Sequence, residues 1–473
     1  MNILAAFAKK VRDHPARVAI VDGRGRSTSY AALEHRAARL AAAWTRRGLR
    51  SGDRVLLALM VDADLYASLA ALWRIGAVAV FPEPALGLAG LRHAVAATAP
   101  RAFVANGIYR VLPWLVPAIR RVPLHLRLSA GEDRIDDLAD LSADAHALIS
   151  FTSGSTGAPK AIARSHGFLA AQDRAVAPLL AAPTPQVDLV GFPVFVVAGL
   201  GRGDTSVLPN WPLRRPHRAK AAAVARHCAR AGVTRLLLSP AIAERIADDV
   251  PPGAATLFVG GGPVFPDLVD RLHRTAPALR IVAVYGSTEA EPIAHHEMRG
   301  LDEGEGLIAG MIADGTRVRI EDNEILVAGD HVVSGYLDPT RNASTKRRDA
   351  DGTIWHRTGD AGRFDADGTL RLLGRQDDRV GALWPFVVEA AARRWPGVRR
   401  AALVAIAGRP VLAIEGDRRH MSDWQARFAA GEVRAVARIP TDRRHGAKTD
   451  TAALRRQLTG SGTEPVSTAR NDC

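Results

Sequence analysis

Helical segments and short apolar runs alternate along this chain, with glycine turns between them. Apolar residues recur at helical spacing over residues 30–47, and after a glycine turn the apolar run 55–59 follows. The order repeats with a helical segment over 65–75 and the run 78–81. Strands that alternate with helices form parallel sheets with helices on their faces. The sequence therefore predicts an α/β fold built around a parallel sheet.

The alternation of helices and strands returns in the middle of the chain and is then replaced by short strands with tight turns. Further elements are predicted as a helix at 216–231, a strand at 234–238, a helix at 240–248 and strands at 256–259 and 280–284. After Gly306 short strands and tight turns take over, at 317–320, 324–327 and 369–373. These segments predict a smaller β-rich layer that closes the large domain.

At 473 residues the chain exceeds what one hydrophobic core usually supports, so more than one domain is expected. A charged run at 375–378 predicts a linker, and beyond it strands at 401–406, 410–414 and 433–438 surround an amphipathic helix near 422–430. We expect a large N-terminal domain over 1–374, a small α+β domain over 379–458 and a disordered tail over 459–473.

Composition excludes several classes of function. The formal net charge is +14, but only six of the 63 Lys and Arg residues are Lys, and the arginines are scattered without aromatic interleaving. No nucleic-acid partner is expected, and the positive field favours anionic substrates. The two cysteines form no metal motif or disulfide framework, and no signal peptide or membrane-length apolar run is visible. A cytoplasmic protein without integral membrane segments is predicted.

The stretch Phe151-Thr-Ser-Gly-Ser-Thr-Gly-Ala-Pro-Lys160 follows an apolar run and combines hydroxyls, two glycines and a scarce lysine. Glycines let backbone N–H groups approach anionic oxygens, hydroxyls donate further hydrogen bonds, and lysine adds a compact positive charge. The stretch predicts a phosphate-binding loop, with a polar turn as the alternative. The spacing of Gly154 and Gly157 differs from that of a Walker loop.

Three more segments carry groups suited to a nucleotide. Val284-Tyr-Gly-Ser-Thr-Glu-Ala290 offers an aromatic ring for stacking, hydroxyls for phosphate and a carboxylate for a metal ion at the end of a strand. Thr358-Gly-Asp360 places a carboxylate on a glycine turn, where it can accept hydrogen bonds from a ribose diol. Gly260-Gly-Gly-Pro263 offers backbone that can approach a flat base, with plain loop geometry as the alternative.

In this order the four segments resemble the motifs of the adenylate-forming superfamily, which includes acyl-CoA synthetases, peptide-synthetase adenylation domains and luciferases. The resemblance extends from about residue 30 to 458 and includes Arg375 and Lys448. It implies a large domain of α/β subdomains with a small mobile C-terminal domain, and it makes residues 375–378 a hinge. It also implies ATP and Mg²⁺ as the nucleotide and metal.

The resemblance assigns a role to each matching residue of this chain. Thr152, Ser153, Ser155, Thr156 and Lys160 would hold the outer phosphates in a loop shaped by Gly154 and Gly157, and Tyr285 would stack on adenine beside Gly261, Gly262, Gly286 and Ser287. Thr288 would contact the α-phosphate, Glu289 would hold Mg²⁺, and Asp360 and Arg375 would bind the ribose hydroxyls. Asp377 matches the hinge residue, and Lys448 matches the lysine that reaches the α-phosphate and the carboxylate.

Several details resemble one branch, the β-lactone synthetases of bacterial olefin biosynthesis. They are Phe192-Pro-Val-Phe195, the segment 203–209 and Asp442-x-Arg444-His445-x-Ala447-Lys448. Gly446 stands where that branch usually has asparagine, and Ala161 replaces a glycine. This branch implies that a 3-hydroxy acid is adenylated and then cyclised to a β-lactone. His445 would orient or deprotonate the hydroxyl, or serve only as a structural hydrogen-bond partner.

Other readings stay open at the level of sequence. The second half-reaction could instead form a thioester with coenzyme A or with the phosphopantetheine thiol of a carrier protein, so a carrier protein or pathway enzymes are possible partners. A nucleotide-binding homologue without catalysis is disfavoured because Glu289, Asp360 and Lys448 are all present. The pocket for the carboxylic acid is expected around residues 192–200 and 309–310.

Overall fold

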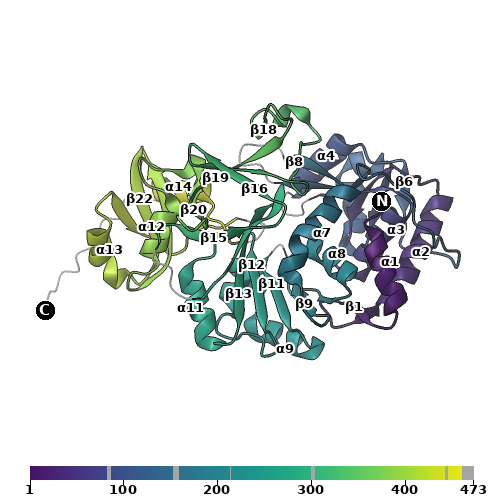
Figure 1. Cartoon of the computed structure of the whole chain (residues 1–473), viewed down its shortest axis with the longest axis horizontal. Helices are drawn as coiled ribbons and strands as arrows, with labels where there is room; N and C mark the ends of the chain where they lie inside the picture. Colours follow the sequence, from purple (N-terminus) through teal and green to yellow (C-terminus); the bar gives the residue numbers. More distant parts are fainter. Residues whose placement is uncertain (83–86, 153–158, 214, 300–303, 443–445, 461–473) are drawn as a thin grey trace.

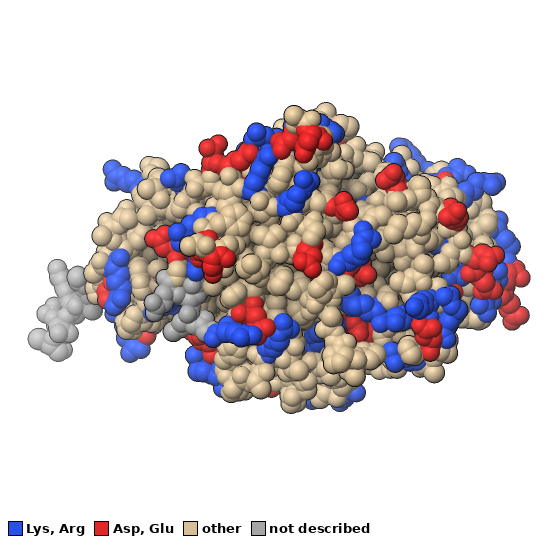
Figure 2. All heavy atoms as spheres, viewed as in Figure 1, with Lys and Arg blue, Asp and Glu red and all other residues tan. Residues whose placement is uncertain are grey.

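The computed structural model describes residues 1–82, 87–152, 159–213, 215–299, 304–442 and 446–460. The N-terminal elements form one end of an elongated molecule, the longest sheet crosses its middle, and the C-terminal elements form the other end (Figure 1). The predicted α/β fold class is confirmed. Lys and Arg side chains alternate with Asp and Glu along the face drawn in Figure 2, without a continuous basic stripe.

The first sheet lies at the N-terminal end and holds the strand that leads into the phosphate motif. Its strand order is β6 (Leu124–Leu126), β5 (Ala102–Ala105), β3 (Arg54–Ala58), β4 (Val78–Phe81), β7 (His146–Thr152) and β8 (Lys160–Ser165). All pairs are parallel except β7 with β8. The parallel strands therefore end at one common edge, where β7 delivers Thr152.

Both faces of this sheet are covered by helices, which explains its continuous apolar strands. The helices are α2 (Tyr30–Arg46) and α3 (Ala63–Arg74) on one face, and α4 (Gly87–Thr98), α5 (Leu112–Leu115) and α6 (Pro117–Arg120) on the other. In β3, Val55 and Leu57 pack into the core that contains α2 and α3, whereas Leu56 packs into the core that contains α4 to α6. Alternate side chains of one strand thus supply two cores.

The second sheet has fourteen strands and joins the α/β part to the β-rich layer. In spatial order they are β16 (Arg317–Glu321), β17 (Glu324–Ala328), β19 (Ile354–Phe364), β20 (Leu370–Arg375), β15 (Leu307–Ile312), β14 (Ala290–Glu297), β13 (Arg280–Ser287), β12 (Thr256–Gly260), β11 (Arg235–Leu238), β9 (Val187–Val190), β10 (Thr205–Val207), β1 (Val18–Val21) and β2 (Ser27–Ser29), with β18 (Lys346–Arg348) paired to β19. The run from β13 through β1 is parallel.

Helices also cover both faces of the parallel part of this sheet. They are α7 (His166–Leu180) and α8 (Pro193–Arg202) on one face and α9 (Ala221–Ala231), α10 (Pro240–Ile246) and α11 (Pro266–Thr275) on the other, while α1 (Leu4–Asp13) packs on α8. Leu237 of β11 packs with α7, and its neighbours Leu236 and Leu238 pack in the core that contains α9 to α11. None of the helices in the described part of the chain could cross a bilayer.

The C-terminal elements have a core of their own. A three-stranded sheet of β21 (Val398–Ile406), β22 (Arg409–Gly416) and β23 (Glu432–Ala435) is covered by α12 (Pro385–Ala392), α13 (Met421–Arg427) and α14 (Thr451–Gly460). Leu403 faces the core with Trp424 of α13, and Val404 faces the core with Leu454 of α14. This separate core agrees with a small domain, and the boundary at 375–378 remains a prediction.

Some predicted elements differ from the structure at their ends. The helix predicted over 216–231 is wrong in its first part, because a 3₁₀ turn at Pro216–Arg218 precedes α9. The strand predicted to end at residue 284 continues to Ser287. The linker residues Gln376–Asp378 form a 3₁₀ turn. Helix α14 includes two residues assigned to the tail, and 461–473 lie outside the described residues.

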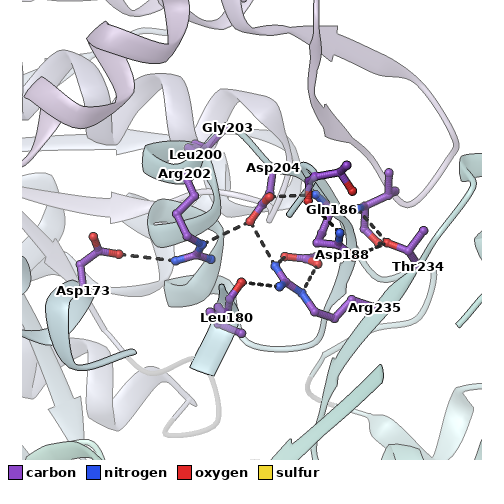
Figure 3. Close-up of polar contacts among 12 residues, drawn as sticks. Asp173, Leu180, Gln186, Asp188, Leu200, Arg202, Gly203, Asp204, Thr234 and Arg235 are labelled. Atoms are coloured by element: carbon purple, nitrogen blue, oxygen red, sulfur yellow. Dashed lines mark hydrogen bonds and ion pairs between the residues drawn. The ribbon is translucent and has the colours of Figure 1, made fainter. Parts of the chain in front are cut away.

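A buried network of ion pairs ties the parallel strands to α7 and α8 (Figure 3). Arg235 on β11 donates to both carboxylate oxygens of Asp188 on β9, at 2.7 and 2.8 Å, and to Asp204 before β10, at 3.1 Å. Asp204 also accepts from Arg202 at the end of α8, 3.2 Å away. Arg235 donates to the carbonyl of Leu180 at the end of α7 as well, at 2.7 Å. The guanidinium therefore fixes four elements at once.

Replacing Asp188 by alanine should lower the free energy of unfolding by about 3–5 kcal/mol, because it leaves the buried Arg235 without its bidentate partner. Urea denaturation followed by far-UV circular dichroism measures the change. The matched control is Asp423→Ala, which removes the partner of Arg427 in an exposed pair on α13 and should cost less than about 1 kcal/mol. Equal losses in the two variants would contradict this account of the network.

Candidate functional site

The site lies where the second sheet delivers the ends of β12 and β13. Gly261, directly after β12, has φ of 77°, and a Cβ there would lie 3.2 Å from the ring of Phe192. A Cβ on Gly260 would come within 2.6 Å of the carbonyl oxygen of Val284 on β13. The turn after β12 therefore requires glycine for its backbone angle and for close packing. Parallel strands commonly bind ligands beyond this edge.

A hydrogen-bonded triad joins three strands beside that turn. The hydroxyl of Tyr285 donates to Asp360 at 2.8 Å, and Arg375 donates to the other carboxylate oxygen of Asp360 at 2.7 Å. Arg375 also donates to the carbonyl of Thr358 at 3.0 Å. Burial, then the charge of Asp360, raises the pKa of Tyr285 well above its usual value. The structure thus brings together Tyr285, Asp360 and Arg375, three of the residues predicted from separate motifs.

Glu289 has a partner that the sequence did not predict. The hydroxyl of Tyr336 donates to the carboxylate of Glu289 at 2.9 Å. The ammonium groups of Lys160 and Lys346 lie 5.1 and 5.5 Å from the centre of the Tyr336 ring. A carboxylate and two lysines therefore meet around one phenol, an arrangement suited to phosphate oxygens and a hard cation.

Lys346 is held close to this cluster. Its ammonium donates to the carbonyl of Val333, and the backbone N–H of Val333 donates to the carbonyl of Glu289 at 2.8 Å. Burial lowers the pKa of Lys346 to about 8, with the Glu289 carboxylate opposing the shift. The scarcity of lysine in the chain was the one sequence signal that could have drawn attention to Lys346.

The rest of the Tyr-Gly-Ser-Thr-Glu segment is held by backbone contacts. The carbonyl of Thr288 accepts from Arg164 on β8 at 2.6 Å, and the N–H of Glu289 donates to the Ser287 hydroxyl at 3.2 Å. A Cβ on Gly286 would lie 3.0 Å from the carbonyl oxygen of Ala290. The segment is a tight strand end tied to β8, and Arg164 is a further contact that the motif alone did not indicate.

The ends of the phosphate motif are placed, and its middle is not. Thr152 is buried at the end of β7 and is the register partner of Lys160 at the start of β8. The predicted residues between them, Ser153, Gly154, Ser155, Thr156 and Gly157, lie outside the described residues. The carbonyl of Pro159 lies 2.8 Å from Nε2 of His93 on α4. The described part is therefore an antiparallel pair of strands, β7 and β8, which flank the predicted loop residues in the sequence.

The loop that carries Lys448 rests on the glycines after β12. A Cβ added to Gly262 would lie 2.6 Å from Cβ of Ala447, which is buried. The carboxylate of Asp442 accepts from the backbone N–H of Ala447 at 3.0 Å and of Lys448 at 2.8 Å. The Lys448 side chain is exposed. The lysine loop of the C-terminal part is thus docked on the large part, next to the Tyr285 segment.

Two features of this loop bear on the predictions. Gly446 has φ of 64°, a region that asparagine also tolerates, so glycine in place of asparagine preserves the turn. Gly446 also packs near Pro216, since a Cβ there would lie 3.1 Å from the ring. His445 lies outside the described residues. Asp377, the predicted hinge residue, belongs to the 3₁₀ turn between β20 and the C-terminal elements.

Two neighbouring apolar cavities lie in the large part, and the first of them lies beside the turn after β12. The first, ≈ 40 Å³, is lined by Phe192, Leu237, Gly260 and Val284 among others. The second, ≈ 80 Å³, extends among α1, α3, α7 and α8. Val176 and Phe195 line both cavities. Phe192 and Phe195 are residues of the segment predicted to form the acid pocket, whereas α1 and α3 were not predicted to take part.

The donor set at Glu289 fits a magnesium ion that is shared with phosphate. Within the described ranges no group of three or more His, Cys, Asp or Glu side chains could enclose a metal. Mg²⁺ bound with a nucleotide usually takes one or two protein carboxylates and completes its shell with phosphate oxygens and water. One carboxylate beside two lysines matches that pattern.

The parallel sheet, the glycine turn and the polar groups at its edge define a nucleotide-binding α/β enzyme. The model of the AMP-binding enzyme family matches residues 7–337. The chain belongs to this family, and it is an AMP-forming carboxylate ligase. The expected superfamily is thereby confirmed.

Alignments with known proteins cover most of the chain. It is 31% identical over 482 residues to the olefin beta-lactone synthetase of Xanthomonas campestris pv. campestris, covering 88% of this chain and 87% of that protein. It is 30% identical over 531 residues to the salicyl-AMP ligase / salicyl-S-ArCP synthetase of Mycobacterium tuberculosis, covering 97% and 91%. The fold of ATP-bound MatB from Rhodopseudomonas palustris matches with a TM-score of 0.80 at 22% identity, covering 97% and 99%.

The contact between Gly262 and Ala447 gives a paired test of the docked lysine loop. Gly262→Ala places a methyl group against Ala447, and overpacking of this kind costs about 1–3 kcal/mol. We expect acid-dependent ATP–pyrophosphate exchange to fall roughly 5- to 150-fold, while thermal unfolding changes little. Adding Ala447→Gly in the same chain removes the opposing methyl group and should restore exchange. Failure of the double variant to recover would show that this contact does not govern docking.

Proposed function

We propose that this protein adenylates a 3-hydroxy carboxylic acid with ATP and then closes the acyl-adenylate to a β-lactone, releasing AMP. The observation that carries the adenylation step is the docking of the Lys448 loop on Gly262, beside the Tyr285, Asp360 and Arg375 triad. This arrangement supports a state in which the C-terminal lysine reaches a nucleotide held by the large part. The olefin beta-lactone synthetase relative supports the second step.

In the first step a carboxylate oxygen attacks the α-phosphorus of ATP, and the bond to pyrophosphate breaks. Lys448 approaches the α-phosphate and the carboxylate, and its fixed charge stabilises charge that develops in the transition state. Lys160 and the phosphate loop hold the departing phosphates. Mg²⁺, held by Glu289, neutralises phosphate charge when bound. Asp360 and Arg375 bind the ribose hydroxyls, and Tyr285 stacks on adenine beside Gly261.

In the second step the β-hydroxyl oxygen attacks the acyl carbonyl within the same molecule. The bond between the carbonyl carbon and AMP breaks, the hydroxyl loses its proton, and the lactone leaves. Because nucleophile and carbonyl are tethered, a high effective molarity offsets part of the ring strain. His445 is the candidate that orients or deprotonates the hydroxyl.

The two cavities support an acid with alkyl groups. Both are lined almost wholly by apolar side chains, and the first begins at Gly260 and Val284, where the activated carboxyl group would lie. The shared residues Val176 and Phe195 lie between them. Alkyl substituents gain free energy by leaving water for such space. An apolar acid is therefore a better substrate than a small polar one.

Thioester formation is the second candidate. The turn at Gln376–Asp378 carries the predicted hinge residue Asp377, and rotation there would let a pantetheine thiol of coenzyme A or of a carrier protein attack the adenylate. The salicyl-AMP ligase / salicyl-S-ArCP synthetase relative supports this alternative. We also propose a division into domains at 375–378 and a cytoplasmic location, whichever of the two products is formed.

Product analysis separates the two candidates. The protein is incubated with ATP, Mg²⁺ and 3-hydroxy or unsubstituted alkanoic acids of matched length, with and without coenzyme A, and products are identified by mass spectrometry. We expect AMP and a lactone from the 3-hydroxy acid without any thiol, and exchange without lactone from the unsubstituted acid. Thioester formed only with coenzyme A, and no lactone from either acid, would contradict cyclisation.

Lys448→Ala should lower acid-dependent pyrophosphate exchange roughly 10²- to 10³-fold, as expected when a charge aimed at the transition state is removed. The matched control is Lys220→Ala, which removes an exposed lysine at the start of α9 and should leave exchange unchanged. ATP binding, followed by calorimetry, should change much less than exchange in the Lys448 variant. Full activity of Lys448→Ala would remove this lysine from the reaction.

A further inference from the structure

An exposed apolar patch lies on the surface of the N-terminal end, outside the site described above. It consists of Met60, Ile108, Val111, Trp114 and Leu115, which are 46, 69, 51, 80 and 51% exposed. They make up most of the large exposed apolar side chains among the described residues. Scattered exposed apolar residues are ordinary, but a cluster that includes a tryptophan indicates a contact with something apolar.

The segment that carries the patch has two opposite faces. A 3₁₀ turn at Gly107–Val111 leads into α5 and α6, and Leu112, Val116 and Ile119 pack into the core under the first sheet. Those buried residues are sufficient to anchor the segment. Met60, in the loop after β3, is adjacent, since a Cβ on Gly107 would lie 3.7 Å from its Cγ. Trp114 and its exposed neighbours therefore add apolar surface that the fold does not bury.

Arginines outnumber acidic residues in the part of the sequence that carries the patch, although Asp62 and Asp64 follow Met60, with Asp64 paired to Arg36. From residue 65 to 131 the only acidic residue is Glu83, and six exposed arginines belong to this stretch, namely Arg92, Arg101, Arg110, Arg120, Arg121 and Arg127. None of the six pairs with a carboxylate in the part of the chain that the structure describes. Elsewhere many arginines are paired, as Arg271 is with Asp248. An apolar patch on a segment that is rich in exposed arginines suits an anionic surface.

We propose that this patch docks the protein onto the surface of an anionic lipid bilayer. Trp114 and the aliphatic side chains would enter the headgroup boundary, where tryptophan is favoured, and the arginines would contact lipid phosphates. A symmetric contact between two copies is disfavoured, because it would set the same arginines against each other. The patch follows the carboxyl ends of β3 and β5, the sheet edge at which β7 also ends. This inference does not depend on the product of the reaction.

Flotation of the full-length protein with vesicles tests the proposal. We expect binding to vesicles of phosphatidylglycerol and phosphatidylcholine, weak binding to pure phosphatidylcholine, and loss in high salt. Trp114→Ala and the double variant Arg120→Glu, Arg121→Glu should each weaken binding roughly 10-fold or more. The charge control is Arg226→Glu with Arg230→Glu on α9, which should bind as wild type. Pyrophosphate exchange with a short, water-soluble acid should be unchanged in all variants.

A second measurement reports directly on the tryptophan. Brominated lipids should quench the fluorescence of the wild-type protein more than that of Trp114→Phe, because only Trp114 would enter the bilayer. Absence of binding to anionic vesicles, or equal quenching in the two proteins, would overturn the proposal. A concentration-dependent dimer that Trp114→Ala dissociates, without vesicle binding, would assign the patch to a second copy of the chain and would overturn it as well.

Discussion

The arrangement of the site depends on the two hydrogen bonds that the carboxylate of Asp360 accepts. One oxygen accepts from Tyr285 on β13 and the other from Arg375 at the end of β20. Because Gln376–Asp378 follow Arg375 directly, the same carboxylate connects the α/β part, the β-rich layer and the start of the C-terminal part. A charged acceptor with two donors holds both in a defined direction. The candidate site and the start of the C-terminal part are thus joined through one residue.

The parallel sheets explain why motifs far apart in the chain can act together. Parallel strands bring their carboxyl ends to one edge, so the segment after β12 and the end of β13 are neighbours although about 25 residues separate them. The phosphate motif follows β7 of the other sheet, and Arg164 on β8 reaches the carbonyl of Thr288 across the junction. The buried network around Arg235 keeps the strands and α7 in register behind the first cavity.

The fold class was predicted from glycine turns and apolar periodicity, which are local signals, whereas the roles of the motif residues came from their resemblance to a known superfamily. Tyr285, Asp360 and Arg375 were named in advance, and the structure brings them together. Tyr336 and Lys346 were missed because each acquires its meaning only from tertiary contact. Lys346 begins the charged run Lys-Arg-Arg348, which reads as a solvated surface. Its partial burial follows from the pairing of β18 with β19.

Other features of the structure could not be predicted from local sequence patterns. The run around Trp114 reads as ordinary core, and only the exposure of its residues separates anchors from the outward patch. The role of α1 and α3 in lining a cavity follows from how two sheets pack, which no local pattern encodes. The predicted helix at 216–231 began too early, since Pro216–Arg218 form a separate 3₁₀ turn and α9 begins only at Ala221.

The most direct measurement of the central claim follows oxygen from the acid. The acid is labelled with ¹⁸O in both carboxylate oxygens and incubated with the protein, ATP and Mg²⁺, and the AMP is analysed by mass spectrometry. If the carboxylate attacks the α-phosphorus, the AMP carries one ¹⁸O atom and the acyl product keeps the other. Unlabelled AMP, or ADP with labelled phosphate, would contradict activation through an acyl-adenylate.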